Sequence, residues 1–223
     1  MKRCVFVISG GEIGDPSFVG GQIAAHRPGD IICADRGARH LHAIGCIPSV
    51  IIGDMDSLDA ALEAYFTEAG SRIITHPARK DETDTHLALE YALDLRPDEV
   101  WIFGALGGRI DHTLANISLL ALGVERGIEV KLVDEWCEVF VVNRYREFDG
   151  EPGQTVSLFP FSSVAEGITL EGFEYPLQDG RMELGRPYGI SNRLSSPRAS
   201  ISIASGTLLV IRYFREECFP GEQ

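Results

Sequence analysis

The sequence predicts a mostly parallel α/β domain over residues 1–144, followed by a smaller antiparallel β-sandwich domain over residues 145–223. In the first part, short continuous apolar runs alternate with helical patterns, and such runs are typical of buried parallel strands. After about residue 145, short strand-like runs follow one another between clusters of Gly, Pro, Ser and Asp, without a helical pattern. This change of pattern places the domain boundary.

The elements of each domain follow in order. In the first domain we expect strands at 4–8, 30–34, 49–52, 72–75, 100–103 and 129–133. Helical patterns lie between them, at about 17–27, 36–44, 58–69, 84–95 and 112–126. Strands that alternate with helices form a parallel sheet covered on both faces. In the second domain we expect antiparallel strands at 155–159, 164–170, 181–184, 199–203 and 207–213.

The charge balance restricts the function. The chain has 33 acidic and 20 basic residues among 223, a formal net charge of -13. Such a surface repels nucleic acid and anionic membranes, whose binding depends on Lys and Arg. It also repels a free nucleotide, so a phosphate-handling function would need a divalent cation as a bridge.

Cysteine usage and hydropathy indicate a reducing cytoplasm. No two cysteines form a CxxC pair and their number is odd, so neither a zinc site nor a disulfide framework is indicated. The apolar run near the amino terminus is too short for a signal peptide. No stretch approaches the ~20 apolar residues of a membrane span. The cysteines are Cys4, Cys33, Cys46, Cys137 and Cys218.

Carboxylates follow several of the expected strands. Ligands of open parallel sheets bind beyond the carboxyl ends of the strands. Four segments at these ends carry at least one acid each, and three of them also contain glycine. They are Ala34-Asp35-Arg36-Gly37-Ala38, Gly53-Asp54-Met55-Asp56-Ser57, Lys80-Asp81-Glu82-Thr83-Asp84 and Gly104-Ala105-Leu106-Gly107-Gly108-Arg109-Ile110-Asp111-His112. Together they indicate a ligand site at one edge of the sheet.

Asp54 and Asp56 are candidate ligands of a hard cation. In an extended segment, residues i and i+2 point to the same side, so both carboxylates can address one ion. Gly53 lets the backbone approach a ligand closely. The alternative is that Asp56 or Ser57 caps the next helix. The acids at the other strand ends favour the cation site.

The third and fourth segments suit phosphate. Asp81 and Asp84 begin a helix, where they can also cap it and compensate its dipole, and Lys80 offers a cation. Gly107 and Gly108 permit a tight turn whose N–H groups can face phosphate oxygens.

Arg109 can clamp a phosphate, and Asp111 either caps the following helix or orients Arg109. The turn at 9–15 is Gly-rich but lacks a known phosphate-binding spacing, so it either touches nucleotide or is only a turn. No nucleophile arrangement is visible. The segments therefore indicate direct transfer between bound substrates, driven by positioning and metal electrostatics.

In order and approximate spacing, these four segments resemble the motifs of the thiamine pyrophosphokinase family. The late Gly189-Ile190-Ser191-Asn192 resembles the thiamine-side motif of that family. The resemblance spans nearly the whole chain, including the change from α/β to β. It implies transfer of a diphosphoryl group from ATP to thiamine, giving thiamine diphosphate and AMP. It also implies a homodimer with the active site at the subunit interface.

The resemblance assigns roles to residues of this sequence. Asp54, Asp56 and Asp84 would hold Mg²⁺ and organise the triphosphate, with Asp35 close by. Arg109 and Asp111 would act on the phosphate and hydroxyl end, and Asp56 or Asp84 could accept the hydroxyl proton. The nucleotide side would include Lys80, Asp81, Thr83, Gly107 and Gly108, and the thiamine pocket Ser191 and Asn192.

Two rival functions remain at this point. A nucleotide-sugar transferase also uses a DxD to hold metal and diphosphate, but it is usually longer and does not need the Gly-Gly-Arg element. A nucleotide-sensing module binds without turnover, and dense acids at four strand ends argue against it.

Overall fold

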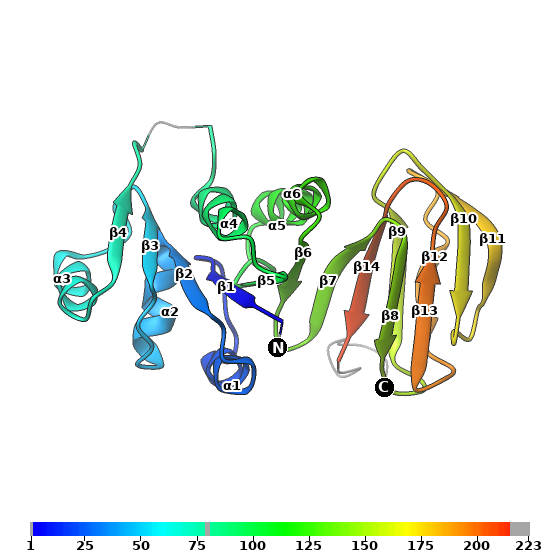
Figure 1. Cartoon of the computed structure of the whole chain (residues 1–223), viewed down its shortest axis with the longest axis horizontal. Helices are drawn as coiled ribbons and strands as arrows, with labels where there is room; N and C mark the ends of the chain where they lie inside the picture. Colours follow the sequence, from blue (N-terminus) through cyan, green and yellow to red (C-terminus); the bar gives the residue numbers. More distant parts are fainter. Residues whose placement is uncertain (1, 79–80, 215–223) are drawn as a thin grey trace. The chain divides into compact units, whose positions relative to one another are not determined.

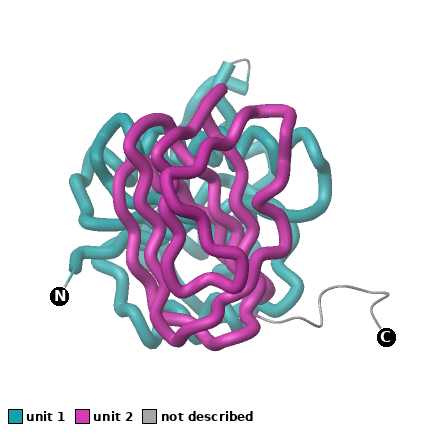
Figure 2. Tube along the Cα trace, turned by 90° about the vertical axis from the view of Figure 1, so that its right-hand side faces the viewer, with its two compact units in different colours: residues 1–135 teal, residues 136–223 magenta. Residues whose placement is uncertain are grey.

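The computed structural model describes residues 2–78 and 81–214, which divide into two compact units. Unit 1 is Met1–Glu135 and unit 2 is Trp136–Gln223 (Figure 2). The boundary expected from the sequence, after residue 144, lies later than this division. The difference arises because residues 137–142 form a strand that pairs with the last strand of unit 2.

Unit 1 contains a parallel sheet with the strand order β6-β5-β1-β2-β3-β4 (Figure 1). Each pair of neighbours in it is parallel, as the sequence predicts. The central strand β1 is apolar and buried throughout, as expected where both faces of a sheet are covered, whereas the edge strand β4 is partly exposed. Their bounds are β1 (Cys4–Ile8), β2 (Asp30–Ala34), β3 (Val50–Gly53), β4 (Arg72–Thr75), β5 (Glu99–Phe103) and β6 (Glu129–Val133).

Helices lie on both faces of this sheet (Figure 1). Helices α1, α2 and α3 contribute Val19, Leu41 and Phe66 to a core that includes Phe6 of β1. Helix α4 packs against β1, β2 and β3. The helices are α1 (Pro16–His26), the 3-10 helix η1 (Asp35–Gly37), α2 (Ala38–Ala43), α3 (Ala60–Glu68), α4 (Asp84–Asp94), α5 (Ile110–Ser118) and α6 (Leu120–Arg126).

Three helices differ from the expected ranges. The helix expected at 36–44 begins as η1, and the one expected at 112–126 is α5 and α6, which meet at Leu119. Helix α3 begins later than expected, and its N-cap is Asp59, whose side chain accepts a hydrogen bond from the backbone N–H of Leu62. Neither Asp56 nor Ser57 therefore caps this helix.

Unit 2 is a β-sandwich, as predicted. Its strands form the orders β12-β9-β14-β7 and β11-β10-β13-β8. One apolar core joins side chains of both, among them Phe140, Leu158, Ile168 and Ile201. The bounds are β7 (Cys137–Val142), β8 (Tyr145–Asp149), β9 (Thr155–Pro160), β10 (Val164–Glu171), β11 (Leu177–Glu183), β12 (Gly189–Arg193), β13 (Arg198–Ser202) and β14 (Leu208–Tyr213).

The sequence did not predict β7, β8 or β12 as strands. The pairing partners of β12 and β7 are distant in sequence, at β9 and β14. No helix within the described residues is long and apolar enough to cross a membrane.

Candidate functional site

The strand order of unit 1 reverses between β1 and β5, and ligands of open α/β sheets bind at such a point. The loops after these two strands contact each other there. The backbone N–H of Ser9 donates to the carbonyl oxygen of Phe103 at 2.8 Å, and that of Gly11 donates to Gly104 at 2.9 Å. A Cβ on residue 11 would lie 2.3 Å from the Gly104 oxygen, so only glycine fits there.

Three carboxylates gather beside this point. Asp35 is the first residue of η1 after β2, Asp54 directly follows β3, and Asp84 is the first residue of α4. One oxygen from each lies within 4.8 Å of the other two. Carboxylate oxygens at this spacing suit Mg²⁺ or a similar hard cation. We call these residues the three-carboxylate group.

Asp35 is the buried member of the group, with 2% of its surface exposed. Its Oδ2 accepts a hydrogen bond from the backbone N–H of Ser57 at 3.4 Å, whereas its buried Oδ1 has no hydrogen-bond partner among the described residues. Burial raises the pKa of Asp35; the Ser57 hydrogen bond opposes this rise, and the negative charges of Asp84, Asp54 and, least, Asp56 add to it. A buried carboxylate with one unsatisfied oxygen is destabilising, so the group fits a divalent cation.

Gly53, the last residue of β3, allows the acids to approach one another. A Cβ at this position would lie 2.5 Å from the Cβ of Asp35 and 3.3 Å from the Cγ of Asp84. The first distance is shorter than non-bonded carbon atoms tolerate, so a side chain at residue 53 would push the two acids apart.

Asp56 lies outside the three-carboxylate group, contrary to the position expected from alternation along an extended segment. Met55 has a φ of 64°, in the left-handed region, so residues 54 and 56 do not point to the same side. The backbone N–H of Asp56 instead donates to Oδ1 of Asp54 at 3.1 Å, and Oδ1 of Asp56 accepts from the hydroxyl of Ser57 at 3.0 Å. Asp35 takes the place in the group that was expected for Asp56.

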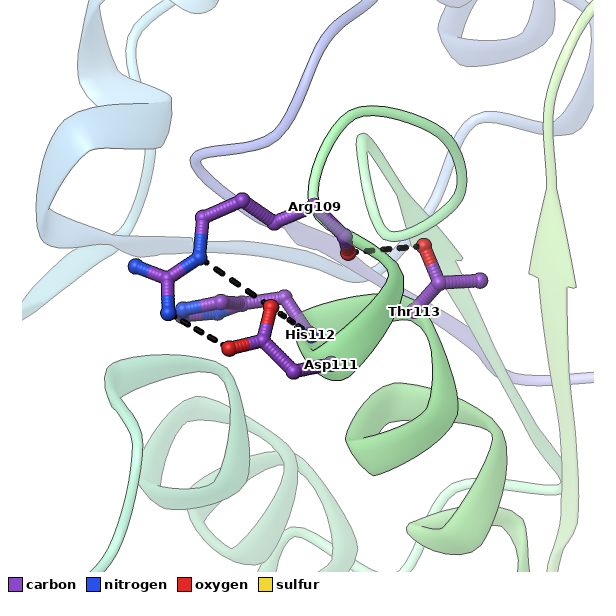
Figure 3. Close-up of polar contacts among 4 residues, drawn as sticks. All are labelled: Arg109, Asp111, His112 and Thr113. Atoms are coloured by element: carbon purple, nitrogen blue, oxygen red, sulfur yellow. Dashed lines mark hydrogen bonds and ion pairs between the residues drawn. The ribbon is translucent and has the colours of Figure 1, made fainter.

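The loop after β5 presents a fixed arginine (Figure 3). Gly107 and Gly108 have φ values of 80° and 66°, which glycine adopts without strain. The Nε of Arg109 donates to Oδ1 of Asp111 at 3.1 Å, and a terminal nitrogen donates to Oδ2. The hydrogen bond from Arg109 lowers the pKa of Asp111 to about 2. Asp111 thus orients Arg109, which is itself at the N-cap position of α5.

The segment before α4 is described only in part. Thr83 is the N-cap of α4, and its hydroxyl oxygen accepts from the backbone N–H of His86 at 3.2 Å. Asp81 is exposed. Lys80, expected to offer a cation to phosphate, lies outside the described residues.

The two candidate residues of unit 2 lie on β12. Ser191 is exposed and has a φ of 57°. Asn192 is 5% exposed, and its amide group binds neighbouring backbone. Its Oδ1 accepts from the N–H groups of Tyr175 and Arg193, and its Nδ2 donates to the carbonyl oxygen of Tyr175 at 2.8 Å. Asn192 therefore holds Tyr175 in place, while the side chain of Ser191 faces solvent.

Two family models match the chain. Residues 28–132 match the model described as Thiamin pyrophosphokinase, catalytic domain, and residues 141–208 match Thiamin pyrophosphokinase, vitamin B1 binding domain. The thiamine pyrophosphokinase of Bacillus subtilis (strain 168) is 38% identical over 183 residues, which cover 81% of this chain and 86% of that protein. The chain belongs to the thiamine pyrophosphokinase family.

Solved thiamine pyrophosphokinase structures share the fold of the whole chain. The crystal structure from Bacillus subtilis superposes with a TM-score of 0.84 at 30% identity, covering 95% of this chain and 99% of that one. The structure from Geobacillus thermodenitrificans gives a TM-score of 0.81 at 28% identity, covering 97% and 100%.

Sequence reasoning placed Asp35 near the site but did not include it among the expected metal ligands. The available signal was its position directly after the apolar run of β2, which predicts a buried carboxylate. Apart from the glycine itself, nothing in the sequence indicated that Gly53 lies so close to Asp35.

Proposed function

We propose that this chain transfers a diphosphoryl group from ATP to thiamine, giving thiamine diphosphate and AMP. The observation that supports this most directly is the three-carboxylate group, with the unpartnered buried oxygen of Asp35. Membership of the thiamine pyrophosphokinase family supports the choice of thiamine and ATP.

In this proposal, Asp35, Asp54 and Asp84 hold Mg²⁺. These carboxylates would hold the ion, and it would supply positive charge that offsets the repulsion between them and the phosphates of ATP. A chain with a net charge of -13 needs such a counter-charge to hold a polyphosphate. The buried position of Asp35 and the first turn of α4 keep the ligand oxygens in place without substrate.

Arg109 is proposed to bind the transferred phosphates. Asp111 occupies its Nε and one terminal nitrogen, and the remaining terminal nitrogen has no hydrogen-bond partner among the described residues. That nitrogen and the backbone N–H groups of Gly107 and Gly108 are the donors offered to phosphate. Asp81 is proposed to contribute to nucleotide binding, as is Lys80, which lies outside the described residues. Thr83 contributes by capping the helix that carries Asp84.

The hydroxyl oxygen of thiamine would attack the β-phosphorus of ATP, with AMP as the leaving group. Of the two acids that could take the hydroxyl proton, we favour Asp56, because it is exposed and lies outside the three-carboxylate group. A loose transition state needs little help from a base, so Asp56→Asn should slow turnover less than loss of a metal ligand.

Thiamine is proposed to bind at the surface of Ser191, with Asn192 acting through Tyr175. We further propose a homodimer with the active site at the subunit interface, working in the cytoplasm. Exposed apolar side chains in both units support self-association, because a second copy would remove them from water. They include Ile110, Leu114, Leu184 and Ile190, which are 76%, 59%, 69% and 50% exposed.

The test is incubation of the protein with ATP, MgCl₂ and thiamine, followed by chromatographic measurement of AMP and thiamine diphosphate. Asp54→Asn and Asp84→Asn should abolish both products while the circular dichroism spectrum is unchanged. Near-normal turnover of these variants at saturating magnesium would contradict the assignment. Absence of AMP with the parent protein would favour a binding module, and stabilisation by a UDP-sugar rather than thiamine would favour a sugar transferase.

A further inference from the structure

A buried hydrogen bond joins two hydroxyl groups beside the three-carboxylate group. The Oγ of Ser9 and the Oγ1 of Thr85 are 2.6 Å apart, and the two residues are 4% and 8% exposed. Ser9 directly follows β1, and Thr85 is the second residue of α4. The bond therefore ties the carboxyl end of a central strand to the first turn of the helix that carries Asp84.

Ser9 is held rigidly by its surroundings. Its N–H donates to the carbonyl oxygen of Phe103 at 2.8 Å. Its own carbonyl oxygen is enclosed by two glycines: a Cβ on Gly37 would lie 2.9 Å from it, and a Cβ on Gly104 would lie 2.8 Å away. Gly37 ends the 3-10 helix that Asp35 begins. Ser9 therefore has a well-defined position. It lies beside the segment that carries Asp35, and its hydroxyl is hydrogen-bonded to the helix that carries Asp84.

Through Thr85, the position of Ser9 restrains the neighbouring residue Asp84. In the adjacent cap, the backbone N–H of His86 donates to the Thr83 hydroxyl oxygen; this bond acts within the helix and orders its first turn. The Ser9–Thr85 bond acts between the helix and the sheet, so it sets where that ordered turn lies. Because Asp84 precedes Thr85 directly, a shift of this turn would move the Asp84 carboxylate relative to Asp35 and Asp54.

We propose that Ser9 and Thr85 form a positioning pair that keeps Asp84 within the three-carboxylate group. The inference rests on the proposed function, since it assigns the pair to metal binding. Groups that orient metal ligands typically change metal affinity or activity by about 10–100-fold when they are removed. Neither hydroxyl needs to touch substrate, so the pair should affect the magnesium requirement more than turnover at saturating magnesium.

The test uses four variants of the full chain: Thr85→Val, Ser9→Ala, the double variant and Thr85→Ser. Magnesium binding is measured by calorimetry without nucleotide, and the half-saturating magnesium concentration is measured from AMP formation. We expect Thr85→Val and Ser9→Ala each to weaken both quantities by about 10-fold or more. Thr85→Ser keeps a hydroxyl and should restore them. The double variant should be no worse than the weaker-binding single variant, because both remove one bond.

Ser71→Ala is the matched control. The hydroxyl of Ser71, a residue that is 6% exposed, donates to the carbonyl oxygen of Pro48 at 2.7 Å. It lies just before β4, at the amino end of this strand, whereas the three-carboxylate group lies beyond the carboxyl ends of the strands. This variant also loses a buried hydroxyl bond, so it should lower thermal stability without changing magnesium binding.

Parental magnesium binding in folded Thr85→Val and Ser9→Ala would overturn the proposal, as would an equal loss in Ser71→Ala. If Thr85→Val does not fold, Ser9→Ala decides alone, because it removes only one oxygen. Failure of the proposed function is seen separately, as magnesium binding that survives in Asp54→Asn and Asp84→Asn. If those two variants lose binding and the hydroxyl variants do not, only the positioning inference fails.

Discussion

Replacing Asp35 by Asn should make the protein more stable than the parent in EDTA and less stable than the parent at saturating magnesium. Asp35 is 2% exposed, its Oδ1 is unpartnered, and two further carboxylates have oxygens within 4.8 Å. Without a cation, its charge is therefore destabilising. Asn keeps the shape and removes the charge, so the variant should be the more stable protein in EDTA.

The size of the effect follows from the geometry. The oxygens of the group lie within 4.8 Å of one another, and two unit charges at that upper limit repel by about 3.5 kcal/mol at an effective dielectric constant of about 20. Asp54 and Asp84 are only half-buried, so solvent screening reduces the gain from Asp35→Asn to about 2 kcal/mol. For a chain of this size that corresponds to a rise in Tm of about 4–8 °C in EDTA.

Magnesium should stabilise the parent much more than the variant. At a magnesium concentration of about 100 times Kd, the parent gains about 2.7 kcal/mol, whereas Asp35→Asn, lacking a ligand charge, gains little. Thermal scans in EDTA and in MgCl₂ measure both values, with Asp56→Asn as the control that leaves both near parental. A lower Tm of Asp35→Asn in EDTA, or an undiminished magnesium response, would refute the reasoning.

The same change predicts a dependence on pH in EDTA. Burial raises the folded-state pKa of Asp35 above the ordinary value of 3.8, so the folded protein binds this proton more tightly than the unfolded chain. The resulting stability is fully present below pH 3.8 and is lost as the pH rises through the raised pKa. The advantage of Asp35→Asn should therefore be large at neutral pH and vanish in acid.

Three further predictions concern other parts of the site. Gly53→Ala should lower stability by about 1–3 kcal/mol and weaken magnesium binding, measured by denaturant unfolding and calorimetry, because its Cβ forces the acids apart; an unchanged magnesium affinity would contradict this. Asp111 should stay ionised down to about pH 2 by carboxyl NMR, and Arg109→Gln should return its midpoint toward the ordinary value; a midpoint unmoved by that change would exclude Arg109 as the cause. Asn192→Ala should free the backbone of Tyr175, so the KM for thiamine and the rate of amide hydrogen exchange at Tyr175 should both rise. Equal exchange rates in the variant and the parent would show that Asn192 does not hold Tyr175.

Most of unit 1 could be predicted because its strands and helices are marked by patterns of neighbouring residues. Buried parallel strands read as continuous apolar runs, and all six expected strands occur within one residue of their expected positions at either end. The break at Leu119 has no such signal, since the residues on both sides favour helix. The helical pattern of the sequence continues without interruption across Leu119, where α5 ends and α6 begins.

The three-carboxylate group shows where prediction from local sequence fails. The sequence placed Asp54 and Asp84 correctly at strand and helix ends. However, side chains two residues apart share a side only where the backbone is extended, and the backbone at Met55 is in the left-handed region. Asp56 therefore does not join Asp54. The membership of Asp35 depends on how closely β2 and β3 bring their ends together, which the glycine at 53 permits. The role of Asn192 likewise depends on Tyr175, 17 residues away, so the spacing in β12 could not reveal it.

The place of β1 within its sheet has a consequence for biosynthesis. One neighbour, β2, follows it closely along the chain, whereas the other pairs Cys4 with Glu99. A nascent chain that has not yet reached β5 therefore carries β1 as an open, apolar edge, which is prone to pair with other chains. The Gly11–Gly104 contact also forms only after β5 has joined. Ribosome-bound chains that end before residue 99 should therefore depend on chaperones, and this dependence should end once β5 has emerged.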